Sequence, residues 1–124
     1  MVVDDDRDAR AIYSMYLRAV GCVVHTAADG VQAILVATAR TPDVIVLDLA
    51  MPTMDGCEAA ERLKQSAATR HIPIIALTAQ PGARESARIS GCAAFLAKPC
   101  LPQLLWCEIS IRLDLESVAS TRRA

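Results

Sequence analysis

The residues of this chain best suited to chemistry are polar groups that each follow directly on a short apolar, strand-like run of the sequence. They are the acidic triplet Asp4–Asp6 after residues 1–3, Asp48 after 44–47, Thr78 after 74–77 and Lys98 after 95–97. In an open parallel α/β sheet, ligands bind outside the carboxyl ends of the strands, where the strand order reverses. The spacing therefore predicts that these side chains line one shared site.

The predicted site concentrates negative charge, which makes it a candidate for a divalent cation. Two carboxylates about 4 Å apart repel each other by several kcal/mol at an effective dielectric constant near 20, unless a cation joins them. Oxygen ligands without histidine or thiolate select Mg²⁺, or alternatively Mn²⁺. We therefore expect Asp4, Asp5 and Asp48 to bind Mg²⁺.

Asp48 is the candidate nucleophile of this site, because a carboxylate can attack phosphorus and form an acyl phosphate. The compact ammonium group of Lys98 suits a phosphoryl oxygen, and the hydroxyl group of Thr78 supplies a second donor. Each of these residues alone is typical of an ordinary turn, helix cap or strand end. Their joint occurrence on successive strand ends favours a phosphoryl-transfer site.

The elements that must position these residues alternate five times along the 124 residues. Strands are expected at 1–4, 22–26, 43–48, 73–78 and 93–97. Helices are expected at 6–19, 30–39, 56–66, 83–90 and 101–116. Strands that alternate with helices form βαβ units with right-handed crossovers, so the prediction is a doubly wound parallel α/β sheet covered on both faces. We expect one domain over residues 1–116 and a C-terminal tail at 117–124.

Composition narrows the class of protein. The chain is 53% hydrophobic and 22% charged with a formal net charge of -1, which gives no bulk electrostatic case for nucleic acid or an anionic membrane. No apolar run approaches the roughly 20 residues of a membrane span, and no secretory leader precedes the first strand, so we expect a cytoplasmic protein. That strand is short beside the typical length of about 5–6 residues, which predicts a residue or two upstream.

The five cysteines are scattered and form no C-x-x-C pair, which favours buried, reduced thiols. Cys57 lies nearest the predicted site and is the only weak redox candidate. The cysteines are Cys22, Cys57, Cys92, Cys100 and Cys107.

Four segments together carry a resemblance to a known family. They are Val2-Val-Asp-Asp-Asp6, Leu47-Asp-Leu-Ala-Met-Pro-Thr-Met-Asp-Gly56, Leu77-Thr-Ala79 and Phe95-Leu-Ala-Lys-Pro99. This set resembles the motifs of the response-regulator receiver domain of two-component signalling, of the chemotaxis-regulator kind, over almost the whole chain. The resemblance implies a (βα)₅, flavodoxin-like receiver fold with strand order 2-1-3-4-5.

The resemblance also implies roles for the site residues. Asp48 looks like the phospho-acceptor, and Asp4 and Asp5 look like the acidic pair that binds Mg²⁺, with Asp5 the more direct ligand. The backbone carbonyl of Ala50 resembles a further protein ligand of the metal.

Three more residues resemble the switch of the family. Thr78 and Lys98 look like the pair that senses the phosphoryl group. Phe95 occupies the aromatic switch position and turns inward when Thr78 is drawn towards the phosphoryl group. Because Phe95 lacks the hydroxyl group of a tyrosine, we expect its inward and outward states to differ by packing alone.

The function implied is a phosphorylation-activated switch in a two-component or phosphorelay system. The donor would be the phosphohistidine of a sensor histidine kinase or a histidine phosphotransfer protein. The domain would catalyse only its own phosphoryl transfer and slow autodephosphorylation, so we do not expect an enzyme that acts on an external substrate.

The last predicted helix has two apolar faces. One face, made of Leu105, Trp106, Ile109 and Leu113, is expected to pack on the sheet. The opposite face is made of Leu101, Leu104, Cys107, Ile111 and Leu115. This second face is either scattered apolar surface or a contact surface for a downstream protein or a homodimer.

Other functions remain as alternatives. A phosphohydrolase of the dehalogenase type carries a second aspartate two positions after its nucleophile, where this chain has Ala50. A flavin-binding module needs a phosphate loop after the first strand, where the triplet Asp4–Asp6 would repel phosphate. A phosphate-independent, receiver-like protein-binding module is the remaining alternative.

Overall fold

The computed structural model describes the backbone of residues 1–51 and 54–123, and side chains as far as residue 114. Strands and helices alternate along the described chain, as predicted. The strands are β1 Val2–Val3, β2 Thr26–Ala27, β3 Ile45–Leu47, β4 Ile74–Thr78 and β5 Ala94–Ala97. The helices are α1 Arg7–Ala19, α2 Gly30–Arg40, α3 Gly56–Gln65, α4 Ala83–Ile89 and α5 Pro102–Arg123.

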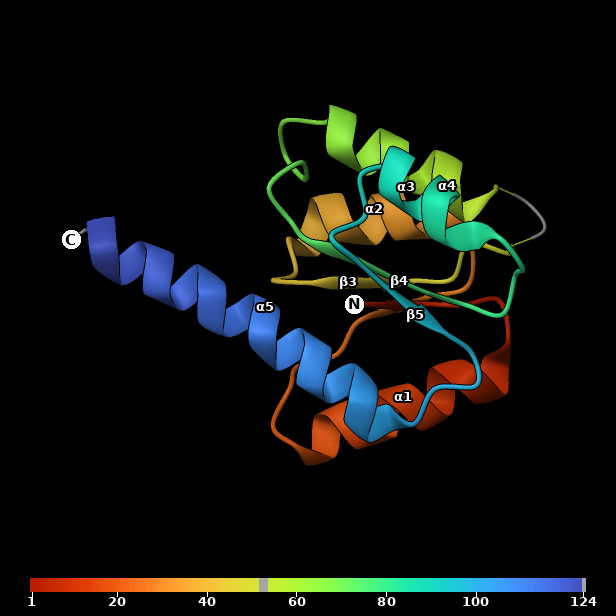
Figure 1. The fold of residues 1–124 in the computed structure, drawn as a ribbon, viewed down its shortest axis with the longest axis horizontal. Coiled ribbons are helices and arrows are strands. Elements are labelled where there is room, and N and C mark those ends of the chain that lie inside the picture. The colour runs from red at the N-terminus through yellow and green to blue at the C-terminus, as the bar shows by residue number, and fades with distance from the viewer. Residues whose placement is uncertain (52–53, 124) are drawn as a thin grey trace.

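The strands form one parallel sheet in the order β2-β1-β3-β4-β5. Helices α1 and α5 cover one face of this sheet, and α2, α3 and α4 cover the other (Figure 1). The predicted fold class, a doubly wound flavodoxin-like sheet with order 2-1-3-4-5, is confirmed. Because β1 lies between β2 and β3, the strand order reverses beside it, and its carboxyl end lies where such sheets bind ligands.

The hydrophobic core is divided by the sheet into two clusters. Val3 and Leu47 point into the cluster under α2, α3 and α4, whereas Val2 and Val46 point towards α1 and α5. Successive strand residues face opposite sides of a sheet, so strands covered on both faces must be apolar at every position. This requirement explains the continuous apolar runs of the sequence.

Helix α5 packs on the sheet through the face that the sequence predicted. Leu105 and Ile109 are fully buried, and Trp106 and Leu113 pack against the same cluster. On the opposite face, Leu104 and Ile111 keep 56% and 49% of their surface exposed, and Leu101 and Cys107 are exposed as well. The remaining member of that face, Leu115, lies outside the described side chains.

Some boundaries differ from the prediction. Residues 22–25 were expected in the second strand, but β2 comprises only Thr26–Ala27. The chain leaves α1 through a turn at Gly21, with φ 100°, and the residue pairs with β1 begin only at Thr26. Val23 is accordingly 87% exposed. Helix α5 continues to Arg123 through residues expected to form a tail. The sequence over 117–123 contains no glycine or proline that would stop a helix.

The expectation of buried thiols is wrong for Cys107, which is exposed, while the other four cysteines are partly buried. All five are free. Within the described part of the chain, no helix has both the length and the apolar character needed to cross a membrane.

Candidate functional site

The site lies at the carboxyl edge of the sheet, where neighbouring strands end at the same level. Asp4 directly follows β1, Asp48 follows β3, Thr78 is the last residue of β4, and Lys98 follows β5. Backbone hydrogen bonds hold these ends together: the amide of Asp48 donates to Val3 O at 3.0 Å, and the amide of Lys98 donates to Thr78 O at 2.9 Å. The sheet therefore aligns the predicted residues along one edge.

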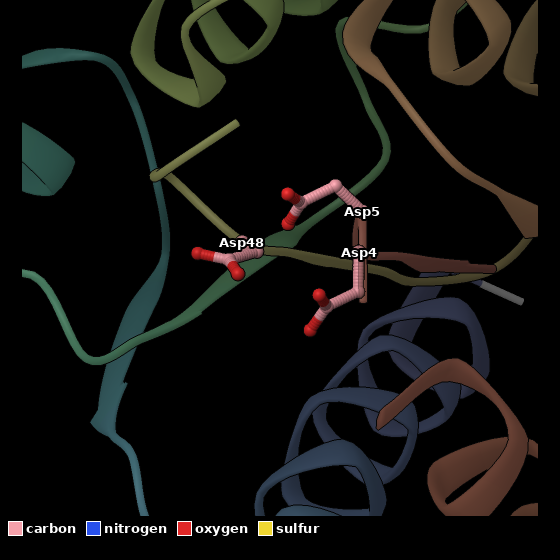
Figure 2. A group of neighbouring side chains, drawn as sticks. All are labelled: Asp4, Asp5 and Asp48. Atoms are coloured by element: carbon pink, nitrogen blue, oxygen red, sulfur yellow. The ribbon is translucent and has the colours of Figure 1, made fainter. Parts of the chain in front are cut away.

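Three carboxylates meet at this edge. One oxygen from each of Asp4, Asp5 and Asp48 lies within 4.8 Å of the other two, and Figure 2 shows the three side chains side by side beyond β1 and β3. Asp4 and Asp48 are 2% and 6% exposed, whereas Asp5 is exposed. The cluster is thus open on the side of Asp5 and closed by protein around the other two.

Lys98 bridges the two buried carboxylates. Its ammonium group contacts Asp4 Oδ2 at 2.5 Å and Asp48 Oδ2 at 3.2 Å. Burial raises the pKa of Asp4, and the hydrogen bond from Lys98 partly offsets this effect. Burial lowers the pKa of Lys98, but its contacts with Asp4 and Asp48 outweigh burial and leave that pKa raised. Lys98 is therefore a protonated counter-ion within the cluster at neutral pH.

The β1–α1 turn holds the acidic pair through a chain of local hydrogen bonds. Asp4 Oδ1 accepts from the amide of Asp6 at 2.9 Å, and Asp6 in turn caps α1 by accepting from the amide of Asp8 at 3.0 Å. The guanidinium group of Arg10, one turn into α1, donates to the backbone carbonyl of Asp4 at 2.7 Å. Helix and acidic turn thus form one hydrogen-bonded unit.

The loop after β3 fixes one oxygen of Asp48. Asp48 Oδ1 accepts from the amide of Ala50 at 3.0 Å, which leaves Oδ2 towards Lys98. The loop then returns so closely that a Cβ atom on Gly56 would lie 2.4 Å from Asp48 O and from Leu49 Cα. Only glycine fits this approach of backbone to backbone.

Thr78 and Phe95 lie farther along the same edge. Thr78 is 1% exposed, and its Oγ1 accepts from the amide of Gln80 at 3.2 Å. The ring of Phe95 is half-buried, and the guanidinium carbon of Arg84, on α4, lies 4.9 Å from its centroid. This is a cation–π contact that sequence reasoning did not include. The expectation that the inward and outward states of the ring differ by packing alone stays a prediction.

Sequence reasoning placed four of these groups together correctly: Asp4, Asp5, Asp48 and Lys98. It missed Arg10 and Arg84, since a long basic side chain on a helix carries no signal of which neighbouring group it will contact. The functional roles of Asp48, Ala50, Thr78 and Phe95 stay predictions.

The donor set fits a hard divalent cation. The cluster offers carboxylate oxygens and no imidazole or thiolate, which is the chemistry of Mg²⁺ and Mn²⁺ sites. Three carboxylates face one ammonium group, so the charge of the cluster is unbalanced. A cation next to Asp5, on the open side, would correct that imbalance.

Comparison with known proteins gives a consistent family. A model of the response regulator receiver domain matches residues 1–110. Response regulator PleD of Caulobacter vibrioides is 37% identical over 111 residues, which are 88% of this chain but 24% of PleD, so the chain spans about a quarter of that relative. Protein PilG of Pseudomonas aeruginosa is 35% identical over 101 residues, 80% of this chain and 75% of PilG.

A solved structure agrees with the sequence comparison. The receiver domain of the sensor histidine kinase PA1611 from Pseudomonas aeruginosa, with a magnesium ion coordinated in its active-site cleft, is 31% identical to this chain. The two superpose with a TM-score of 0.85 over 91% of this chain and 94% of that one. With the fold, the carboxyl-edge cluster and these matches in agreement, the chain belongs to the response regulator receiver domain family, whose members are phosphorylation-dependent signalling switches.

Proposed function

We propose that Asp48 accepts a phosphoryl group from the phosphohistidine of a sensor histidine kinase or a histidine phosphotransfer protein. The observation that carries this proposal is the pair of contacts that the Asp48 carboxylate makes. One of its oxygens is held by the amide of Ala50, while the other lies 3.2 Å from the ammonium group of Lys98. An anchored carboxylate beside a fixed cation is a nucleophile positioned for attack on phosphorus.

The residues that would hold the divalent cation are Asp4, Asp5 and Asp48, with the backbone carbonyl of Ala50. The unbalanced charge of the cluster and the magnesium ion in the PA1611 receiver domain support Mg²⁺, with Mn²⁺ as an alternative. When bound, the cation supplies positive charge that offsets the repulsion between these carboxylates and the incoming phosphoryl group.

In the transfer step, Asp48 Oδ2 attacks phosphorus. As the new O–P bond forms, the P–N bond of the phosphohistidine breaks, and its electron pair stays on the ring nitrogen of the donor. Lys98 then donates to a phosphoryl oxygen instead of to Asp48. The phosphoryl group remains on Asp48, so the domain is a switch that changes state rather than an enzyme with an external substrate.

A groove beside the acceptor supports docking of a protein donor. It has a volume of about 440 Å³ and lies between α1 and the loop after β5. Lys98 lines this groove, together with the acidic side chains of Asp6 and Asp8. Ile12, which is 56% exposed, adds an apolar side chain to the lining. Ile12 is exposed on α1 because its side chain faces this groove and not the core.

The output surface comprises α4, β5 and the outer face of α5. Phosphorylation would draw the hydroxyl group of Thr78 towards Asp48, which gives the Phe95 ring room to turn inward and changes the surface between α4 and α5. Leu101, Leu104 and Ile111 are exposed there. We propose that this surface binds a downstream protein or a second copy of the domain.

Intact-mass measurement with acetyl phosphate tests the acceptor. Wild-type protein with Mg²⁺ is expected to gain one phosphoryl group, whereas Asp48→Asn and chelated wild-type protein are expected to gain none. Equal labelling of Asp48→Asn would show that another residue is the acceptor. No labelling of the wild type by any phosphohistidine or small donor would instead support a phosphate-independent protein-binding module.

A further inference from the structure

The Asp4–Asp5 peptide is held by a residue outside the proposed set of site residues. In β1 the paired residues end at Val3, so the carbonyl group of Asp4 lies just beyond the ladder to β3. Its partner is the guanidinium group of Arg10, which donates to it at 2.7 Å from α1. A hydrogen bond from a charged donor is about twice as strong as a neutral one, so this contact is a strong restraint on the peptide.

This restraint on the peptide affects the position of the Asp5 side chain. The plane of the Asp4–Asp5 peptide sets the direction in which the backbone enters Asp5, and hence where the Asp5 carboxylate points. Asp4 has further restraints in Lys98 and in the amide of Asp6. Among the described residues, no hydrogen bond reaches the Asp5 carboxylate, which is exposed, so its placement depends on the backbone beneath it.

We propose that Arg10 is a positioning residue for the metal site: it holds the Asp4–Asp5 peptide so that the Asp5 carboxylate points into the cluster. This inference rests on the proposed function, because it assumes that Asp5 binds the cation. Arg10 itself contacts a backbone carbonyl and no carboxylate oxygen, so it acts through Asp5. Loss of such an outer support typically weakens metal binding about 10- to 100-fold.

The chain offers a matched control in Arg7. Arg7 is the first residue of α1, is exposed and carries the same charge. Within the described residues it makes no hydrogen bond to the acidic turn. Replacing either arginine by methionine removes one positive charge near the cluster and keeps most of the apolar stem. Only Arg10→Met also removes the donor to Asp4.

Calorimetric titration with Mg²⁺ tests the proposal. Arg10→Met is expected to raise the Kd of Mg²⁺ by about tenfold or more, and Arg7→Met by less than about threefold. Arg10→Lys, which keeps a charged donor, is expected to recover most of the affinity. Phosphorylation of Arg10→Met by acetyl phosphate should return to the wild-type rate at saturating Mg²⁺, since Asp48 and Lys98 are unchanged. Circular dichroism of Arg10→Met without Mg²⁺ checks for a general loss of structure, which would overturn the positioning role.

The outcomes separate the two hypotheses. Equal weakening in Arg10→Met and Arg7→Met would show that charge alone matters and would overturn the positioning role. Unchanged affinity in Arg10→Met would overturn it as well. If wild-type protein itself bound no Mg²⁺, the proposed function would fail before the role of Arg10 was reached.

Discussion

Among single residues, Asp5 and Thr78 have different proposed roles, Asp5 in binding the cation and Thr78 in sensing the phosphoryl group. Asp5 is exposed at the open side of the cluster, whereas Thr78 is buried at the end of β4 and is hydrogen-bonded to Gln80. Because β3, which precedes Asp48, lies between β1 and β4 in the sheet, Asp5 and Thr78 lie on different sides of Asp48. Their substitution should separate metal binding from signal transmission.

Asp5→Ala is expected to weaken Mg²⁺ binding and phosphorylation together, because it removes a direct oxygen ligand. At a free Mg²⁺ concentration about 100 times the Kd, the wild type gains about 2.7 kcal/mol in its free energy of unfolding, and Asp5→Ala should lose most of that gain. Urea denaturation with and without Mg²⁺ measures this difference.

Thr78→Ala serves as the comparison, since it should keep nearly the full Mg²⁺ stabilisation while phosphorylation no longer changes the output surface. If Asp5→Ala were stabilised by Mg²⁺ as strongly as the wild type, the acidic pair would be wrongly assigned.

At the scale of single elements, α4 lies against β5, the strand that carries Phe95. Helix α4 contributes Arg84, whose guanidinium carbon lies 4.9 Å from the centroid of Phe95 on β5. The same helix carries Arg88, which is engaged by Glu85 at its exposed surface. One arginine of α4 thus contacts the Phe95 ring, whereas the other pairs with Glu85.

Arg84→Ala is expected to shift the Phe95 ring away from its present position, because it removes a contact worth about 0.5–1 kcal/mol at an exposed site. That free energy corresponds to about a two- to fivefold change in the equilibrium between the two ring positions. Aromatic NMR signals of Phe95, the only phenylalanine of the chain, report the populations directly. Arg88→Ala should leave them unchanged, and an equal shift in both variants would exclude the cation–π contact as the cause.

The helices and strands also show how much of the structure could be predicted from the sequence alone. The order of elements and the groups at the strand ends were predictable, because parallel strands share an edge and buried strands need apolar residues at every position. Residues 22–25 were misassigned because an apolar run before an edge strand has the same composition whether or not it pairs. The contacts of Arg10 and Arg84 depend on how α1 and α4 pack against the sheet, and the local sequence does not determine that packing.

At the scale of the whole molecule, the described exposed apolar residues of α5 form one continuous face. Leu104 and Ile111 are separated by seven residues, so they lie on the same side of the helix, away from the sheet. Buried in an interface, each would contribute roughly 1–3 kcal/mol to association. This face is the strongest candidate for the contact that the proposed function requires.

The double variant Leu104→Glu/Ile111→Glu is expected to abolish self-association or partner binding and to leave the fold intact, because both side chains are about half exposed. Sedimentation measures association, and circular dichroism measures the fold. Val23→Glu is the matched control, since Val23 is 87% exposed just before β2, at the other edge of the sheet. Association that survived the double variant but not Val23→Glu would place the interface at the β2 edge.

Helix α5 also has a mechanical consequence. Its 22 residues span about 33 Å at 1.5 Å per residue, and only its first part lies against α1 and the sheet (Figure 1). It is therefore a lever arm with its fulcrum on the domain. Leu113 is the last described side chain that packs on the core, and Arg123 lies about 15 Å farther along the helix. A tilt of about 10° at Leu113 would therefore carry Arg123 through about 3 Å. A small change in how α5 packs on the sheet would thus become a larger displacement at the far end of the helix.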